Sequence, residues 1–305
     1  MNERALEYVE DLLGFWKADE MPADEYHRLP GASPSQLAQF WRVTDAEARC
    51  RMETLEENSP FLLMGSLGHQ MVLEPNRELP RIALHPLKYP GKDGKELDWH
   101  MGAAVCKQWV KAQDQAGFLT MPRKAKKGCP GWDELLLMVK SISTHPMVRP
   151  WLQDTESIFE SSVIGSWVSP FKIMMRSRVD LAPGGEPFLA DCKFTRDPSP
   201  EGFPYHIADR GYHIQAALTL DLWNAWRPKD QRTGWRLIAV GQKAPHLTVV
   251  HELDEAFIEA GRKAYQKLIY RYEFCYRTGI WAGHAPIAHV ATMPTKWKRI
   301  EEEEE

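Results

Sequence analysis

The chain has 305 residues, of which 43% are hydrophobic and 26% charged, and a formal net charge of −4 at pH 7. No apolar run approaches the ~20 residues of a membrane helix, and the opening sequence MNERALEYVED is too acidic for a signal peptide. The five scattered cysteines contain no CxxC pair, so neither a disulfide framework nor a zinc ribbon is indicated. We therefore expect a globular protein of a reducing cytoplasm, without a membrane partner, whose positive charge must be concentrated locally if it binds nucleic acid.

Three helices are predicted in the first 75 residues. Apolar residues recur at helical spacing over residues 3–16, which predicts an amphipathic helix. Ser33 followed by Pro34 is typical of a helix start. The stretch 60–75 is apolar nearly all round, which predicts a short buried helix. His69 is the strongly polar group in its middle, and a lone histidine there is either a hydrogen-bonded core residue or a metal ligand.

A loop-rich stretch with one helical segment follows, over residues 87–127. It ends in the basic run PRKAKK. Such runs are usually solvated surface, but this one is also the best candidate in the chain for contacts with phosphates. Its lysines are Lys124, Lys126 and Lys127.

Residues 176–195 predict a β-hairpin. Charged and apolar residues alternate on both sides of the sequence PGGEP, whose glycines and prolines are typical of a tight turn. Folding about this turn sets Asp180 opposite Asp191 and Arg178 opposite Lys193. Opposed residues have Cβ atoms about 5 Å apart, where like charges repel. Two carboxylates so placed need a cation between them, which predicts a divalent-metal site with a lysine at its edge.

Two interpretations of the hairpin stay open at this point. Acid-x-Lys triplets arise by chance in a chain of this composition, and the polar face could be solvated sheet surface with surface ion pairs. The alternative is metal-assisted phosphodiester hydrolysis, which needs hard oxygen ligands for Mg²⁺ or Mn²⁺ and a positive charge near the phosphate. Asp180, Asp191 and Lys193 supply that set. Glu160, on a strand predicted over residues 157–162, could complete it.

The remaining pattern predicts the rest of the fold. A helix is expected over 132–143, and the elements after the hairpin are a helix near 211–226, strands near 234–241 and 246–252, and a long helix from Asp254 to about Arg277 closed by Gly279. This order predicts an α/β sandwich with a mixed central sheet flanked by helices. Nothing marks a second domain, so we expect a single domain over 1–300 with its core at about 33–280. The acidic tail 301–305 should be disordered.

Several segments, taken in order, resemble a known family. MRSRVD, LADCKFT and GYHIQAAL look like the nuclease core of the PD-(D/E)XK superfamily. Upstream, SPSQL, MGSLGHQMVLEP and STHPMVRPWL followed by FESSV resemble its exonuclease VIII (RecE-like) branch of phage and prophage recombination exonucleases. The resemblance covers about residues 33–226 and is carried by the order and spacing of the segments. It implies a restriction-endonuclease-like α/β core.

The resemblance also implies roles for individual residues. Lys193 would be the catalytic lysine, acting with Asp180 and Asp191, and Gln215 would contact DNA or organise the site. The ligands it implies for Mg²⁺, for which Mn²⁺ can substitute, are His69, Glu160, Asp180 and Asp191. In two places the chain departs from the family pattern. The sequence SRVD stands where the family has Gly-Arg-Pro-Asp, and Thr219 stands where a tyrosine is expected. These departures bear on substrate preference more than on activity.

The expected function is that of a Mg²⁺-dependent deoxyribonuclease that digests linear duplex DNA from its ends. The resemblance implies 5′ to 3′ polarity, a ring-like homo-oligomer and a single-strand-annealing partner protein. The alternatives are an endonuclease or repair nuclease of the same fold, an inactive nuclease-fold DNA-binding module, and a protein outside nucleic-acid chemistry. An inactive module normally lacks a ligand or the lysine, and this chain has both. The expected DNA contacts are Arg176, Arg178, Tyr212, Lys124, Lys126 and Lys127.

Overall fold

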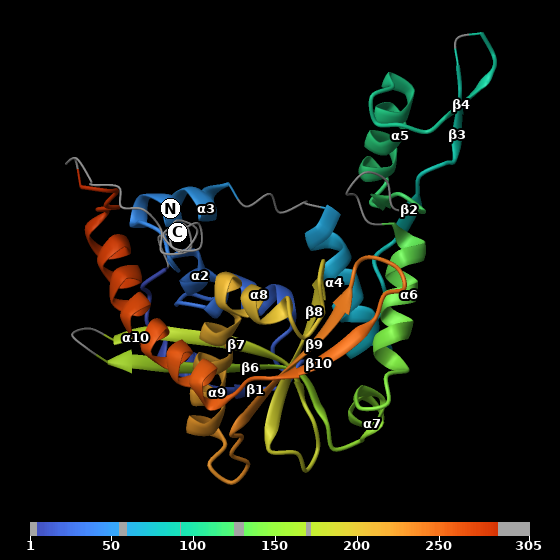
Figure 1. Ribbon diagram of the computed structural model, residues 1–305. Coiled ribbons are helices and arrows are strands. Elements are labelled where there is room, and N and C mark those ends of the chain that lie inside the picture. Colours follow the sequence, from blue (N-terminus) through green and yellow to red (C-terminus); the bar gives the residue numbers. More distant parts are fainter. Residues whose placement is uncertain (1–4, 55–59, 92, 125–130, 169–171, 286–305) are drawn as a thin grey trace, which may run out of the picture.

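A mixed six-stranded sheet forms the centre of the protein (Figure 1). The computed structural model describes residues 5–54, 60–91, 93–124, 131–168 and 172–285. The strand order is β1-β6-β7-β8-β9-β10, with β8 and β9 parallel and the other neighbours antiparallel. The strands are β1 (Gly14–Trp16), β6 (Ile158–Val168), β7 (Lys172–Ala182), β8 (Phe188–Thr195), β9 (Gly234–Gly241) and β10 (Thr248–Glu252). The predicted mixed α/β architecture is confirmed.

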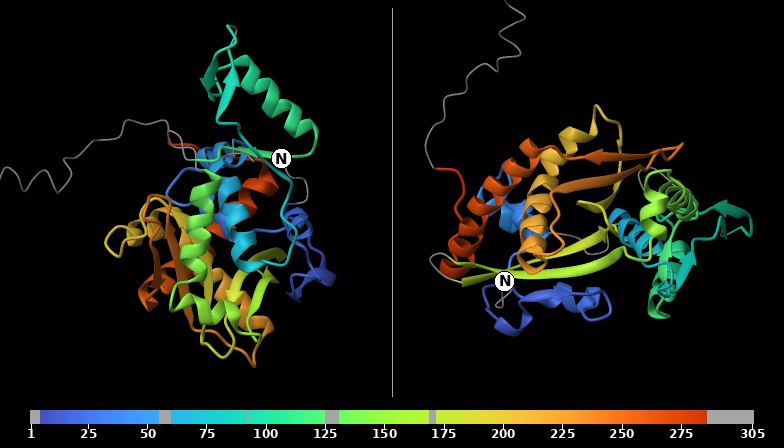
Figure 2. Two further views of the ribbon diagram at one scale, coloured as in Figure 1. Left: turned by 90° about the vertical axis from the view of Figure 1, so that its right-hand side faces the viewer. Right: turned by 90° about the horizontal axis from the view of Figure 1, so that it is seen from below.

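Helices cover both faces of this sheet (Figure 2). On one face α2, α9 and α10 enclose the larger hydrophobic core, and on the other α4 and α6 enclose a second core. The helices of these two layers are α2 (Pro34–Gln39), α4 (Pro60–Leu73), α6 (Trp132–Ser143), α9 (Tyr212–Trp226) and α10 (Glu255–Thr278). Among the described residues, no helix is long and apolar enough to cross a membrane.

Shorter elements surround these layers. Those that lie close to the sheet or to its helices are η1 (Glu10–Leu12), α1 (Ala23–Arg28), α3 (Asp45–Glu53), α7 (Val148–Gln153) and α8 (Phe203–Arg210). A further group extends away from the sheet (Figure 1). It contains β2 (Ile82–Leu84), β3 (Lys88–Pro90), β4 (Glu96–Asp98), α5 (Ala104–Gln115) and β5 (Leu119–Met121).

The helix ends follow from their local sequence. At the start of α2, Ser33 and Gln36 form a reciprocal capping box, so the predicted helix start is confirmed. At the start of α10, the Asp254 side chain accepts a hydrogen bond from the Phe257 backbone N–H. The same helix ends at Gly279, whose φ of 70° satisfies the left-handed cap that glycine adopts most easily.

The prediction of a helix over residues 3–16 is wrong. Of the described part, Glu10–Leu12 form one 3₁₀ turn, and Gly14–Trp16 form β1, which pairs with the edge of β6. The exposed edge of β6 supplies backbone hydrogen-bond partners that a short isolated helix lacks, so tertiary pairing overrides the periodicity. The helix predicted over 60–75 is present as α4, but Leu62 on it is 51% exposed, so α4 is buried on one side only.

The predicted hairpin is formed by β7 and β8. Leu181 pairs with Ala190, the neighbour of the predicted pair of Asp180 and Asp191. Beyond this pair no ladder between β7 and β8 is recorded among the described residues. Strand β8 pairs with β9, in parallel, along its whole length. The predicted pairing of Arg178 with Lys193 is therefore wrong, because the described ladder between β7 and β8 does not reach these residues.

Candidate active site

Glu160 and Asp180 lie at the same level of neighbouring strands. The ladder between β6 and β7 is interrupted at this one level, and Glu160 has a φ of 49°, a left-handed conformation that is uncommon outside glycine. The pairs on either side of the interruption are Phe159–Leu181 and Ser161–Val179. A local distortion of the sheet therefore sits where two acidic residues meet.

The same distortion changes the face to which side chains point. Val179 packs into the core beside α9, whereas Leu181, two residues further on, packs into the core beside α4 and α6. Side chains two residues apart on a regular strand point to the same face. The alternation of side chains between the two faces of the sheet is therefore reversed at Asp180 in β7. It is reversed in the same way at Glu160 in β6. Backbone strain of this kind costs about 1–3 kcal/mol and is concentrated at functional sites.

Helix α4 brings His69 to Asp180. The Nδ1 atom of His69 lies 3.3 Å from an Asp180 carboxylate oxygen. Gly68 permits this approach, because a Cβ at this position would lie 2.2 Å from the ring of Phe194 on β8. Burial, together with the nearby Lys193 ammonium, lowers the pKa of His69. This shift favours the neutral imidazole that a metal ligand requires.

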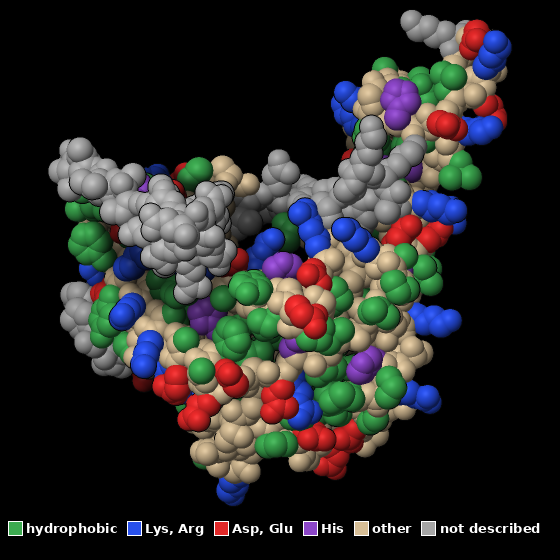
Figure 3. Space-filling model, viewed as in Figure 1, with side chains coloured by type: hydrophobic (Ala, Val, Ile, Leu, Met, Phe, Trp, Pro, Cys, Tyr) green, Lys and Arg blue, Asp and Glu red, His purple; other side chains and the backbone are tan. Residues whose placement is uncertain are grey.

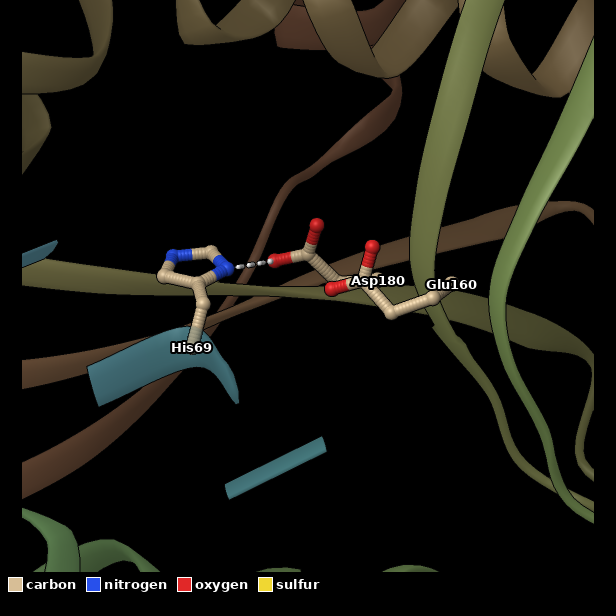
Figure 4. A group of neighbouring side chains, drawn as sticks. All are labelled: His69, Glu160 and Asp180. Atoms are coloured by element: carbon tan, nitrogen blue, oxygen red, sulfur yellow. Dashed lines mark ion pairs between the residues drawn. The ribbon is translucent and has the colours of Figure 1, made fainter. Parts of the chain in front are cut away.

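His69, Glu160 and Asp180 point toward one another (Figure 4). One nitrogen or oxygen atom from each lies within 4.8 Å of the other two. Burial and the Asp180 carboxylate raise the pKa of Glu160 to about 7, and burial and Asp191 raise the pKa of Asp180 to about 8. Two buried carboxylates that repel each other beside a neutral imidazole are a donor set that a divalent cation would stabilise. These residues therefore fit a metal such as Mg²⁺ or Mn²⁺.

Strand β8 supplies Asp191 and Lys193 next to this cluster. The Lys193 ammonium forms an ion pair with Asp191, and the Gln215 amide donates a hydrogen bond of 2.6 Å to the other Asp191 oxygen. The Lys193 Nζ atom also lies 4.9 Å from the centre of the Tyr212 ring, a cation–π contact. Burial opposes the charged form of Lys193, but Asp191 and Asp180 outweigh burial and raise its pKa. The lysine is therefore a fixed positive charge.

Three of the four predicted ligands thus form one cluster, and the fourth lies beside it. Asp191 is 1% exposed and directs its oxygens to Gln215 and Lys193. Asp180 is tied to the same strand, because the backbone N–H of Cys192 donates to its carboxylate at 2.8 Å. A role of Asp191 as a direct ligand stays a prediction.

Thr219, which stands where the resemblance leads us to expect a tyrosine, supports Gln215. Its hydroxyl donates to the Gln215 backbone carbonyl at 2.6 Å and lies 2.6 Å from the Ser177 hydroxyl of β7. Both hydroxyls are buried. This contact joins α9 to β7 close to the residue that holds Asp191.

The positions of Arg176 and Arg178 do not favour the predicted contacts with DNA, which stay a prediction. Arg176 is 6% exposed and lies over the ring of Tyr26, 4.8 Å from its centre. Arg178 lies opposite Ser162 in the ladder and donates to Glu160 at 2.6 Å. Both guanidinium groups therefore make contacts inside the protein. The local sequence gives no signal for this, because Tyr26 is about 150 residues away in the chain.

The other predicted DNA contacts are only partly described. Tyr212 lies beneath Lys193 and is partly buried, and Lys124 follows β5. Lys126 and Lys127 lie outside the described residues. On the face seen in Figure 3, basic and acidic side chains of the described residues are interspersed. A role in DNA binding stays a prediction for these residues.

The class of protein follows from the relation between β7, β8 and α4. An aspartate on the first strand of a hairpin, an Asp-x-Lys sequence on the second, and a glutamate and a histidine directed at the first aspartate form a PD-(D/E)XK nuclease-type core. The chain belongs to the family described as PDDEXK-like domain of unknown function (DUF3799), whose sequence model matches residues 33–291.

Two solved structures were compared with this fold, and one of them supports it. A candidate exonuclease from Eubacterium rectale is similar with a TM-score of 0.54 and 10% identity, over 88% of this chain and 91% of that chain. The protein SSO0001 has a TM-score of 0.27 and 13% identity, over 68% of this chain and 86% of that chain, which is too low a similarity to support an argument. No curated protein matches the chain. These findings support the PD-(D/E)XK superfamily but do not single out its RecE-like branch.

Replacement of His69 separates its two possible roles. The side chain is 27% exposed, so His69→Ala removes a donor without leaving a closed cavity. If His69 is a ligand, the variant should fold normally and need roughly 10-fold or more additional metal for the same activity. Melting temperature and activity against metal concentration are measured on one preparation. A lower melting temperature with an unchanged metal requirement would instead show a core-packing role.

Proposed function

We propose that the protein is a metal-dependent deoxyribonuclease that hydrolyses linear double-stranded DNA from its ends. The observation that carries this proposal is the half-buried Lys193, kept charged by Asp191, beside the cluster of His69, Glu160 and Asp180. Burying repelling carboxylates next to a charged lysine is costly for a purely structural or DNA-binding protein. The same arrangement favours catalysis at a phosphodiester, where negative charge develops in the transition state.

Each residue has a defined task in this proposal. His69, Glu160 and Asp180 would hold the divalent cation, with Asp191 alongside, and a bound cation supplies Lewis acidity and a more acidic water. The Lys193 ammonium offsets charge on the phosphate or orients the attacking water. Gln215 fixes Asp191 and thereby keeps Lys193 in place.

The finer assignments rest on the resemblance to RecE-like exonucleases. We propose 5′ to 3′ polarity, a ring-like homo-oligomer threaded by DNA, and a single-strand-annealing partner in phage-type recombination. The E. rectale candidate exonuclease is similar over most of both chains, and at 10% identity this similarity supports the shared fold alone.

Digestion of plasmid DNA tests the proposal directly. We expect linear duplex DNA to be degraded to small products with Mg²⁺, and covalently closed plasmid to stay intact. EDTA should abolish the reaction, as should the matched Asp180→Asn variant. Cutting of the closed plasmid would show an endonuclease. DNA binding without hydrolysis in Mg²⁺ or Mn²⁺ would show a binding module instead. Substrates labelled at either 5′ or 3′ end report the polarity.

A further inference from the structure

The N-terminal segment, defined here as residues 5–32, is attached to the two strands that carry Glu160 and Asp180. It precedes residue 33, where the family match begins. At one end β1 pairs with β6, with Phe15 opposite Val163. At the other end Ala32 forms a parallel bridge to β7, exchanging backbone hydrogen bonds of 2.9 and 3.0 Å with Met174 and Arg176. The segment is therefore a fixed part of the sheet.

Arg178 joins this segment to Glu160 of the candidate metal site. Its Nε atom donates to Glu160 at 2.6 Å, and its Nη1 atom donates to the Met21 carbonyl at 3.0 Å and to the Ser162 hydroxyl at 3.1 Å. The side chains of Arg178 and Glu160 are only 10% and 11% exposed. A planar guanidinium bound on two edges can adopt few orientations, so it fixes the carboxylate it contacts.

Tyr26 of α1 completes the cradle for this arginine. Its ring is 4% exposed and lies 4.8 Å from the Arg176 guanidinium and 5.9 Å from that of Arg178. Arg176 also donates to the Tyr26 backbone carbonyl at 3.2 Å. The N-terminal segment thus contributes an aromatic face and two carbonyls to the two arginines of β7.

We propose that the N-terminal segment positions Glu160 for metal binding, acting through Arg178. The inference rests on the proposed metal site. Glu160 is held in a left-handed conformation inside a strand, and such a residue persists only where its surroundings over-determine it. From outside the ligand set, Arg178 holds the Glu160 carboxylate and the Tyr26 ring flanks Arg178, which makes both of them positioning residues.

Positioning and simple charge effects predict opposite outcomes. The Arg178 cation repels a bound metal, so if charge alone mattered, Arg178→Met would strengthen Mn²⁺ binding and Arg178→Lys would leave it unchanged. If Arg178 positions Glu160, both variants should weaken Mn²⁺ binding, roughly 10-fold or more for methionine. Tyr26→Leu keeps every charge and should also weaken binding, whereas Tyr26→Phe keeps the ring and should not.

Calorimetric titration of chelator-treated, full-length protein with Mn²⁺ measures these affinities without reference to activity. Arg236→Met is the matched control, because it removes an arginine that pairs with Glu252 elsewhere in the same sheet. It should bind Mn²⁺ like wild type. In the Arg178→Met background, Tyr26→Leu should cause no further loss, because both changes act on one contact.

The outcomes distinguish this inference from the proposed function. Stronger or unchanged Mn²⁺ binding by Arg178→Met, or unchanged binding by Tyr26→Leu, overturns the positioning role and leaves the metal site in place. Wild-type protein that binds no Mn²⁺, or binds it as well after Asp180→Asn, overturns the metal site itself. If Arg178→Met fails to fold, Tyr26→Leu and Arg178→Lys carry the test.

Discussion

Lys193→Ala should lower the rate of DNA hydrolysis by roughly 10²–10³-fold, the effect of removing one preorganised group that stabilises transition-state charge. The lysine is held by Asp191 and by the ring of Tyr212, and its pKa is raised, so it is charged at every pH at which the protein is expected to work. Single-turnover cleavage of a labelled linear duplex in saturating Mg²⁺ measures the loss. DNA binding, followed by fluorescence anisotropy, should change little.

Two further variants control for the loss of a positive charge. Lys263→Ala removes an exposed lysine of α10 and should cleave like wild type. Lys193→Arg keeps the charge but replaces a compact ammonium with a wider planar group, so we expect only partial activity. Cleavage by purified Lys193→Ala at close to the wild-type rate would remove Lys193 from the catalytic set.

Elements with a local cause could be predicted from the sequence. The helix start at Ser33 follows from a side chain that bonds its own backbone neighbours, and the end of α10 follows from the one residue type that adopts positive φ freely. The hairpin of β7 and β8 follows from its turn residues. Asp191 and Lys193 share a strand face by spacing alone, and the structure pairs them directly.

Features with a long-range cause could not be predicted. Residues 14–16 are extended because β6 offers an edge, although their own pattern favours a helix. The left-handed Glu160 breaks a regular strand pattern that gives no sign of the break. Arg178 looks like a surface cation on an alternating strand, and only the return of the N-terminal segment makes it an interior residue. The sequence also cannot place His69 near Asp180, because the 3.3 Å between its Nδ1 atom and the Asp180 carboxylate depends on how α4 packs against the sheet.

The melting temperature of the metal-free protein should depend on pH through Asp180 and Glu160. Their pKa values of about 8 and about 7 lie above those of the same groups in an unfolded chain, which are roughly 4. The folded state therefore binds these two protons more tightly, and their contribution to stability falls as pH rises from about 4 to about 8. The lowered pKa of His69 acts in the opposite direction around pH 6.5. The contribution of Asp180 is therefore isolated by comparing wild type with a variant that lacks this carboxylate.

Asp180→Asn removes one of the two carboxylates and keeps its shape. Its melting temperature relative to wild type, both metal-free, should rise by about 5 °C between pH 5.5 and 8.5, since a raised pKa costs about 1.4 kcal/mol per unit. Added Mg²⁺ favours the ionised carboxylates, so it should stabilise wild type more at pH 8.5 than at pH 5.5 and leave the variant unchanged. Differential scanning calorimetry at both pH values measures this. Parallel curves for the two proteins, with and without Mg²⁺, would mean that Asp180 ionises normally and does not bind the cation.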